Sequence, residues 1–89
     1  MSGILEHWRK KIDAIDKKII ILLGQRSAIV KKICQWKKTN NIPALDKKRW
    51  PEVLQTRIKI ARNLDLEKDF IEEIYEIIHK NSLKIEKQL

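Results

Sequence analysis

The chain has 89 residues, which suits one domain with a small core, and we expect residues 1–89 to form a single domain. Hydrophobic residues make up 43% of it, and only two glycines and two prolines interrupt it, so a disordered chain is excluded and helices are favoured. The net charge of +8 allows nucleic acid, an acidic membrane surface or small anions as partners without choosing among them.

A long amphipathic helix is expected from about residue 4 to about residue 38. Ser2 or Gly3 can cap its start, and the Thr-Asn-Asn segment at 39–41 can end it, because asparagine tolerates the left-handed conformation. Residues at alternating steps of three and four along this helix form a series on one face, and all but one of its members are hydrophobic. We call this series the α-stripe; it comprises Leu5, Trp8, Ile12, Ile15, Ile19, Leu22, Arg26, Ile29, Ile33 and Trp36.

The length of this helix predicts a partner. At 1.5 Å per residue it is roughly 50 Å long, whereas a compact chain of this size is about 30 Å across. The rest of the chain is therefore too short to cover the α-stripe. We expect a second copy to cover it, in an intertwined homodimer.

Two further helices are expected after a connector at residues 42–50. Asp46 resembles a helix cap, but Pro51 is favoured at the first helical position. The second helix is therefore expected to begin at Pro51, with Trp50 outside it, and to continue to about residue 62, where Asn63 can cap its end. Asp65 can cap a third helix from about residue 66 to about residue 87. The chain is thus predicted to be all-α, with helices in the order long, short, long.

Arg26 is the single charge on the α-stripe. A buried guanidinium costs several kcal/mol unless an anion meets it. The anion can be a carboxylate of the protein, such as Asp16 or a glutamate of a partner chain, or it can be a bound ligand. We favour a bound small anion.

Several segments resemble the all-helical chorismate mutase family. They are WRKKIDAID at 8–16, LLGQR at 22–26, VKKI at 30–33 leading to Lys37, Ile42-Pro43, residues 46–49, and FIEEIY at 70–75 followed by Ser82. The resemblance covers most of the chain and implies one chorismate mutase-like domain that forms a homodimer, with sites shared between chains. It implies rearrangement of the dicarboxylate chorismate to prephenate in aromatic amino-acid biosynthesis. No cofactor and no metal are implied.

The resemblance also implies roles for ten residues, one of which departs from the family pattern. Arg26 would bind one carboxylate, Arg9 of the other subunit a second, and Lys37 a carboxylate and the ether oxygen. Asp46 and Arg49 would lie near the ring hydroxyl, and Ser82 would contact a carboxylate. The ring would be enclosed by Ile33, His79 and Leu83. Glu86 stands where the family has an ether-binding glutamine, so it would act as a catalytic group only when protonated, with activity favoured at lower pH.

Trp50 is the second departure, because it stands where the family has a glutamate that accepts a hydrogen bond from the ring hydroxyl. Some proteins of this fold lack that glutamate and eliminate pyruvate from isochorismate to form salicylate, so an isochorismate pyruvate lyase is the alternative function, beside an impaired mutase. Trp50 itself is expected to be a packing residue or loop cover.

Other classes are less well supported by the pattern. A nucleic-acid-binding helical module would suit the charge, but the basic residues are spread over several faces and the connector is too long for a helix-turn-helix. A plain dimerisation or regulatory module is a third option. The lone Cys34 is expected to be a small buried hydrophobe and favours a reducing compartment. The longest apolar run, residues 19–23, is too short to span a bilayer. We therefore expect a cytoplasmic protein with no nucleic-acid or membrane partner.

Overall fold

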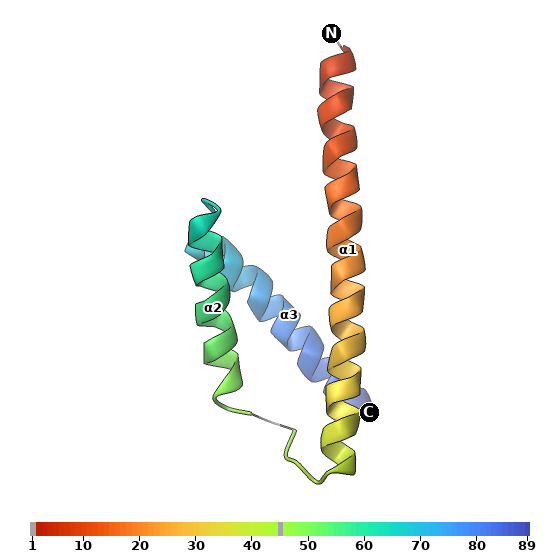
Figure 1. Ribbon diagram of the computed structural model, residues 1–89, viewed down its shortest axis with the longest axis vertical. Helices are drawn as coiled ribbons and strands as arrows, with labels where there is room; N and C mark the ends of the chain where they lie inside the picture. Colours follow the sequence, from red (N-terminus) through yellow and green to blue (C-terminus); the bar gives the residue numbers. More distant parts are fainter. Residues whose placement is uncertain (1, 45) are drawn as a thin grey trace.

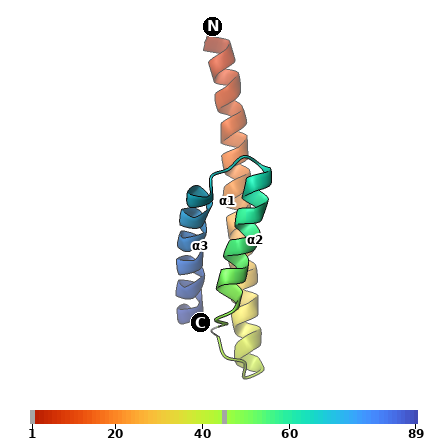
Figure 2. The ribbon, with the colours of Figure 1, turned by 90° about the vertical axis from the view of Figure 1, so that its left-hand side faces the viewer.

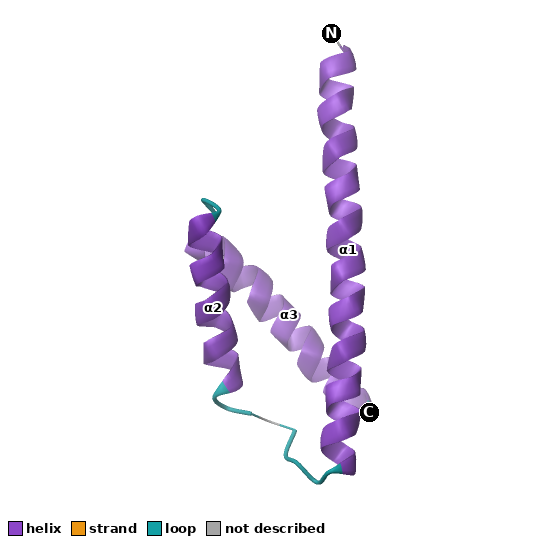
Figure 3. Ribbon diagram, viewed as in Figure 1, coloured by secondary structure: helices purple, strands orange, loops and turns teal. Residues whose placement is uncertain are grey.

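The computed structural model describes residues 2–44 and 46–89 of the chain and shows three helices in that part (Figure 1). They are α1 (Ser2–Thr39), α2 (Arg49–Asn63) and α3 (Lys68–Gln88). No strand occurs among the described residues (Figure 3). The predicted all-α class and the long, short, long order are confirmed. Ser2 and Gly3 both lie inside α1, so the prediction that one of them caps this helix is wrong.

The end of α1 follows the prediction made from residues 39–41. Asn41 adopts the left-handed conformation, with a φ of 54°. The backbone N–H of Ile42 donates to the carbonyl of Lys37 at 2.9 Å, and the N–H of Asn41 donates to the carbonyl of Lys38 at 3.3 Å. This pair of hydrogen bonds is the Schellman motif, which satisfies carbonyls that the last turn leaves without a helical partner.

The start of α2 differs from the prediction. The helix begins at Arg49, so Trp50 lies in its first turn and Pro51 is its third residue. Proline is tolerated there because the first backbone N–H groups of a helix have no helical acceptor. Asp46 lies in the turn before the helix and does not cap it; its side chain accepts a hydrogen bond from the N–H of Lys48 at 3.1 Å.

The turn between α2 and α3 repeats the Schellman motif. Asp65 adopts the left-handed conformation, with a φ of 57°. The N–H of Leu66 donates to the carbonyl of Ala61 at 3.0 Å, and the N–H of Asp65 donates to the carbonyl of Arg62 at 3.4 Å. The predictions that Asn63 caps the end of α2 and that Asp65 caps α3 are therefore wrong. Asn63 is the last residue of α2, and Asp65 closes that helix instead of opening the next one.

The three helices pack through α3, which contacts both α1 and α2. Figures 1 and 2 show α3 running from the far end of α2 to the C-terminal half of α1, while the N-terminal half of α1 extends beyond both other helices. The hydrophobic side chains buried in the described part of the chain are Val53, Ile58 and Ala61 of α2 and Ile85 of α3. This core positions α2 against α3 and includes no residue of α1.

The α-stripe stays open to solvent along its whole length in this single chain. Its nine hydrophobic members expose 48–61% of their surfaces. The described chain measures 61 × 24 × 16 Å, so its long axis far exceeds the ~30 Å of a compact fold of this size. The prediction that this chain is too small to cover its own first helix is confirmed. None of the described helices is long and apolar enough to cross a membrane.

Candidate active site

A pocket of about 210 Å³ opens where the three helices approach one another. It lies beside the C-terminal half of α1, the connector, the start of α2 and the C-terminal half of α3. Its lining residues are Arg26, Val30, Ile33, Cys34, Lys37, Ala44, Asp46, Arg49, Trp50, Val53, His79, Ser82, Leu83 and Glu86. A wider hollow of about 440 Å³ near Ile58 and Lys68 is lined mostly by exposed side chains, and none of its lining residues is a carboxylate, histidine or cysteine.

The structure brings nine of the ten residues implied by the resemblance to this pocket. The helical period explains why residues distant in sequence meet here. On α1, residues 26, 30, 33 and 37 follow steps of four and three, so they share one face. On α3, residues 79, 82, 83 and 86 stand at positions i, i+3, i+4 and i+7, so they also share one face. Each helix therefore presents a single row of side chains to the pocket.

Arg26 is half-buried and faces α3. Its Nη1 donates a hydrogen bond to Oγ of Ser82 at 2.9 Å, and that hydroxyl donates to the carbonyl of Ile78 at 3.1 Å. No ion pair joins Arg26 to a carboxylate within the described residues, including Asp16. A guanidinium has five N–H donors in a planar fork, so most of them remain available to an anion in the pocket.

Two further cations line the pocket. Nζ of Lys37 donates to the carbonyl of Ala44 at 3.1 Å, which ties the end of α1 to the connector and leaves other ammonium protons available. Nη1 of Arg49 lies 2.9 Å from Oε1 of Glu52, and both side chains are more than half exposed. An ion pair this exposed contributes little stability, so Arg49 can turn from Glu52 to a bound anion at low cost.

Two acidic side chains moderate this positive charge. Asp46 is exposed at the connector, and Glu86 is half-buried on α3. Arg26, Lys37 and Arg49 together outnumber them, so the pocket favours an anionic ligand. Glu86 shares the pocket with both Arg26 and Lys37, where an ionised carboxylate would compete with an anionic ligand for these cations.

Trp50 and His79 form an aromatic pair at the pocket. Their ring centroids are 4.1 Å apart and their planes differ by 13°, so the rings are stacked. Trp50 belongs to the first turn of α2 and His79 to α3, and both are half-buried. The expectation that Trp50 packs is consistent with this contact. Sequence reasoning missed that its partner is His79, because no periodicity relates residues on different helices.

Cys34 was also misjudged from the sequence. It is half-buried and lines the pocket, so it is not a fully buried hydrophobe. Cys34 lies next to the row formed by residues 26, 30, 33 and 37 of α1, and this position could have indicated that it lines the pocket. Val30, Ala44 and Val53 complete the apolar part of the lining and were not predicted as site residues.

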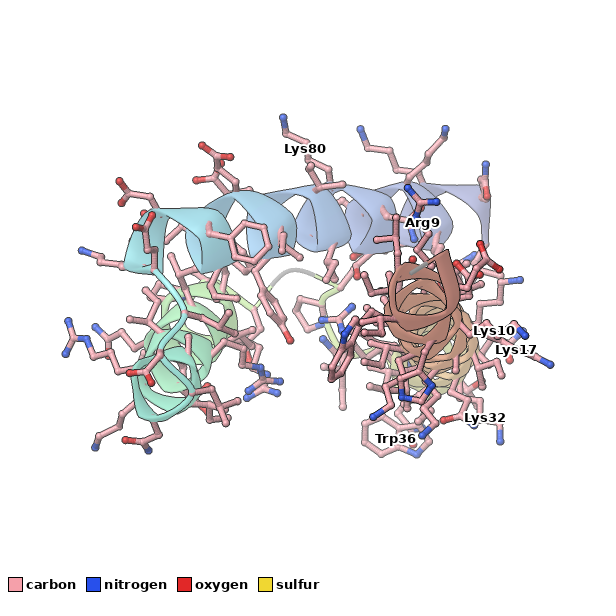
Figure 4. All side chains as sticks on the ribbon, turned by 90° about the horizontal axis from the view of Figure 1, so that it is seen from above. Arg9, Lys10, Lys17, Lys32, Trp36 and Lys80 are labelled. Carbon is pink, nitrogen blue, oxygen red and sulfur yellow. The ribbon has the colours of Figure 1, made fainter. Side chains whose placement is uncertain are left out.

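Arg9 lies apart from the other predicted site residues. It is an exposed residue of the free N-terminal half of α1 and does not line the pocket. It is 17 residues before Arg26, which corresponds to about 25 Å along the helix. In Figure 4, Arg9 points from α1 toward the side on which α3 lies, whereas Lys10 and Lys17 point away from α2. Within one chain, Arg9 cannot contribute to the pocket.

The fold and the site together define an all-helical protein whose three helices surround a small, cation-lined pocket. The family described as chorismate mutase type II matches residues 8–87 of the sequence. The chain belongs to this family, which confirms the prediction made from the sequence and supports an isomerase.

Three relatives illustrate the similarity. A bifunctional chorismate mutase/prephenate dehydratase of Buchnera aphidicola subsp. Acyrthosiphon pisum is 34% identical over 82 residues, 92% of this chain and 21% of that protein. A chorismate mutase of Methanocaldococcus jannaschii is 28% identical over 80 residues, 90% of this chain and 81% of that protein. A bifunctional protein of Enterobacter agglomerans is 26% identical over 91% of this chain. The chain thus spans about a fifth of the bifunctional relatives and most of the archaeal one.

Proposed function

We propose that this chain is a chorismate mutase that rearranges chorismate to prephenate in aromatic amino-acid biosynthesis. The observation that carries the proposal is Arg26, a half-buried guanidinium that lines a pocket and pairs with a hydroxyl in place of a carboxylate. Membership of the chorismate mutase type II family supplies the substrate that such a pocket would receive. Chorismate has two carboxylates, and the pocket has three cations to meet them.

The chemistry suits a pocket of this kind. The rearrangement breaks an ether C–O bond while a C–C bond forms, and it needs neither a nucleophile nor a proton donor. The protein has to hold one compact conformer of the substrate and to stabilise the negative charge that develops on the ether oxygen. We assign one carboxylate of the substrate to Arg26 and Ser82. Lys37 and Glu86 would contact the ether oxygen, and Asp46 and Arg49 would lie on the hydroxyl side of the ring. Ile33, His79 and Leu83 would enclose the ring.

Arg9 and the α-stripe lead us to propose a homodimer with sites shared between chains. A second copy of α1 packed along the stripe would cover hydrophobic side chains that this chain leaves half exposed. The N-terminal half of α1 already extends beyond α2 and α3 in the single chain (Figures 1 and 2), and in such a dimer it would reach toward the pocket of the partner. Arg9 would then complete the partner's site as its fourth cation.

Replacing Glu86 with glutamine should raise kcat/KM for chorismate at pH 7.5 by roughly tenfold. The amide donates a hydrogen bond to the ether oxygen at any pH, whereas the carboxyl group can do so only when protonated. The measurement is prephenate formation from pH 5 to pH 9. The charged or titratable groups that share the pocket are Arg26, Lys37, Asp46, Arg49, His79 and Cys34.

Glu76→Gln is the control, since Glu76 is an exposed residue of α3 that does not line the pocket. It should leave the whole profile unchanged. A Glu86→Gln variant with lower activity at every pH would contradict the role assigned to Glu86.

Trp50 supports a second candidate function, an isochorismate pyruvate lyase. Trp50 lines the pocket and has no hydrogen-bond acceptor for a ring hydroxyl. One experiment separates the two functions: the protein is incubated with chorismate and, separately, with isochorismate, and the products are identified. Prephenate from chorismate supports the mutase, whereas salicylate and pyruvate from isochorismate support the lyase. The absence of all three products would refute both.

A nucleic-acid-binding function finds less support in the structure. In Figure 4, Lys80 points outward from α3, whereas Lys10, Lys17 and Lys32 point from α1 in other directions. The labelled cations therefore do not form one recognition surface of the kind that places a helix in a groove.

A further inference from the structure

The stacked pair of Trp50 and His79 gives the pocket an aromatic side. The two rings come from different helices, lie 4.1 Å apart between centroids, and both line the pocket. Each is half-buried. The two rings in contact form one continuous aromatic surface at the pocket.

A ligand ring can use this surface in two ways. Stacking occupies one face of each ring, which leaves the opposite faces and the ring edges. An aromatic ligand gains from offset stacking on a face and also from an edge-to-face contact. A saturated ring of the same size has no π-system and gains only ordinary dispersion contact. The preference for an aromatic ring therefore holds whichever part of the pair faces the pocket.

The cations lie around the same cavity. Arg26 has free N–H donors in a planar fork that matches a carboxylate, and Lys37 and Arg49 add two further positive charges. A flat ring that carries two carboxylates would thus meet cations and the aromatic pair at once.

We propose that this pocket binds planar aromatic dicarboxylates, and that Trp50 and His79 make it prefer them over saturated-ring dicarboxylates of equal charge. The inference rests on the proposed function only in using the same pocket, where such acids would compete with chorismate. Trp50 acts here as a specificity-determining residue.

The test compares two probes, isophthalate and cis-1,3-cyclohexanedicarboxylate, by isothermal titration calorimetry with the full chain. Both are dianions with carboxylates at ring positions 1 and 3, and they differ in ring planarity. Isophthalate should bind with a Kd roughly fivefold lower. Trp50→Leu should reduce this preference to less than twofold and leave the Kd of the saturated acid within twofold, whereas Trp50→Phe should retain most of it.

Phe70→Leu is the matched control, since it removes an aromatic ring at an exposed position of α3 away from the pocket. It should leave the preference unchanged, and circular dichroism of every variant should show the same helix content. Equal affinity of the native chain for the two acids would overturn the proposal, as would failure of isophthalate to bind. A preference that survives Trp50→Leu would overturn it too.

Turnover of chorismate by the same samples separates this inference from the proposed function. Prephenate formation without a preference for isophthalate would refute the inference alone. A clear preference without prephenate formation would refute the mutase activity and leave the aromatic recognition standing. If the chain both forms prephenate and prefers isophthalate, isophthalate should inhibit the reaction competitively with respect to chorismate.

Discussion

Arg26→Ala should lower kcat/KM for chorismate by at least about 100-fold and leave the helices intact. Arg26 is a half-buried cation of the pocket, and its guanidinium donates a hydrogen bond to Ser82 and forms no ion pair with a carboxylate of the described residues. Removing it eliminates the charged contact with a bound carboxylate. Lys37 offers only a point charge in its place, and Arg49 is assigned to the hydroxyl side of the ring. Steady-state kinetics and circular dichroism measure the two parts of this prediction.

Two further variants test whether the forked donors of Arg26 or its positive charge alone is responsible for the activity. Arg26→Lys keeps the charge but loses the forked donors, so it should recover only part of the lost activity. Lys17→Ala removes an exposed cation of α1 that points away from α2 (Figure 4) and does not line the pocket, so it should change kcat/KM by less than twofold. If Arg26→Ala retained native activity with a native helix content, the assignment of Arg26 to substrate binding would be refuted.

Ile15→Glu should dissociate the proposed dimer and abolish most of the activity, with a loss of about 100-fold or more. Ile15 lies on the α-stripe and is 55% exposed in the single chain. In a dimer that covers the stripe, the substitution would bury two carboxylates among hydrophobic side chains, at a cost of several kcal/mol each. The separated chains would also lose the Arg9 that we assign to the partner's pocket.

Sedimentation equilibrium at a fixed protein concentration would measure the assembly, and prephenate formation the activity. Gln25→Glu is the matched control, because it makes the same change of charge at an exposed position of α1 outside the stripe. It should leave both the dimer and the activity intact. A native chain that sediments as a monomer, or an Ile15→Glu variant that remains an active dimer, would contradict the proposal.

The resemblance to the family supplied most of the predicted site residues, and residue periodicity explains why those on one helix share a face. Arg26 and Lys37 are eleven positions apart, close to three helical turns, so they had to share a face once the helix was established. On α3, His79, Ser82 and Glu86 also share a face, because they are three, four and seven positions apart. The chemistry of the predicted residues on each row followed from the resemblance to the family. Nine of the ten residues that the resemblance implied line one pocket, and their roles there remain predictions.

Helical periodicity could not predict which residues on different helices contact each other. The hydrogen bond from Arg26 to Ser82 and the stack of Trp50 on His79 join residues that are far apart in the chain. Their existence depends on how α3 crosses the other two helices, and no local spacing encodes that crossing. Likewise, Asp65 has the side chain of a helix cap, but the backbone hydrogen bonds that end α2 require it in the left-handed conformation.

The sequence by itself determined the three helices and the α-stripe, because both follow from a local repeat of hydrophobic and polar residues, and the helical period determined which residues share a face. The tertiary structure decided which rows meet, that Arg26 pairs with a hydroxyl, and that an aromatic pair lines one side of the pocket. Those outcomes arise from the packing of α3 against both other helices, which is a non-local balance of burial and hydrogen bonding.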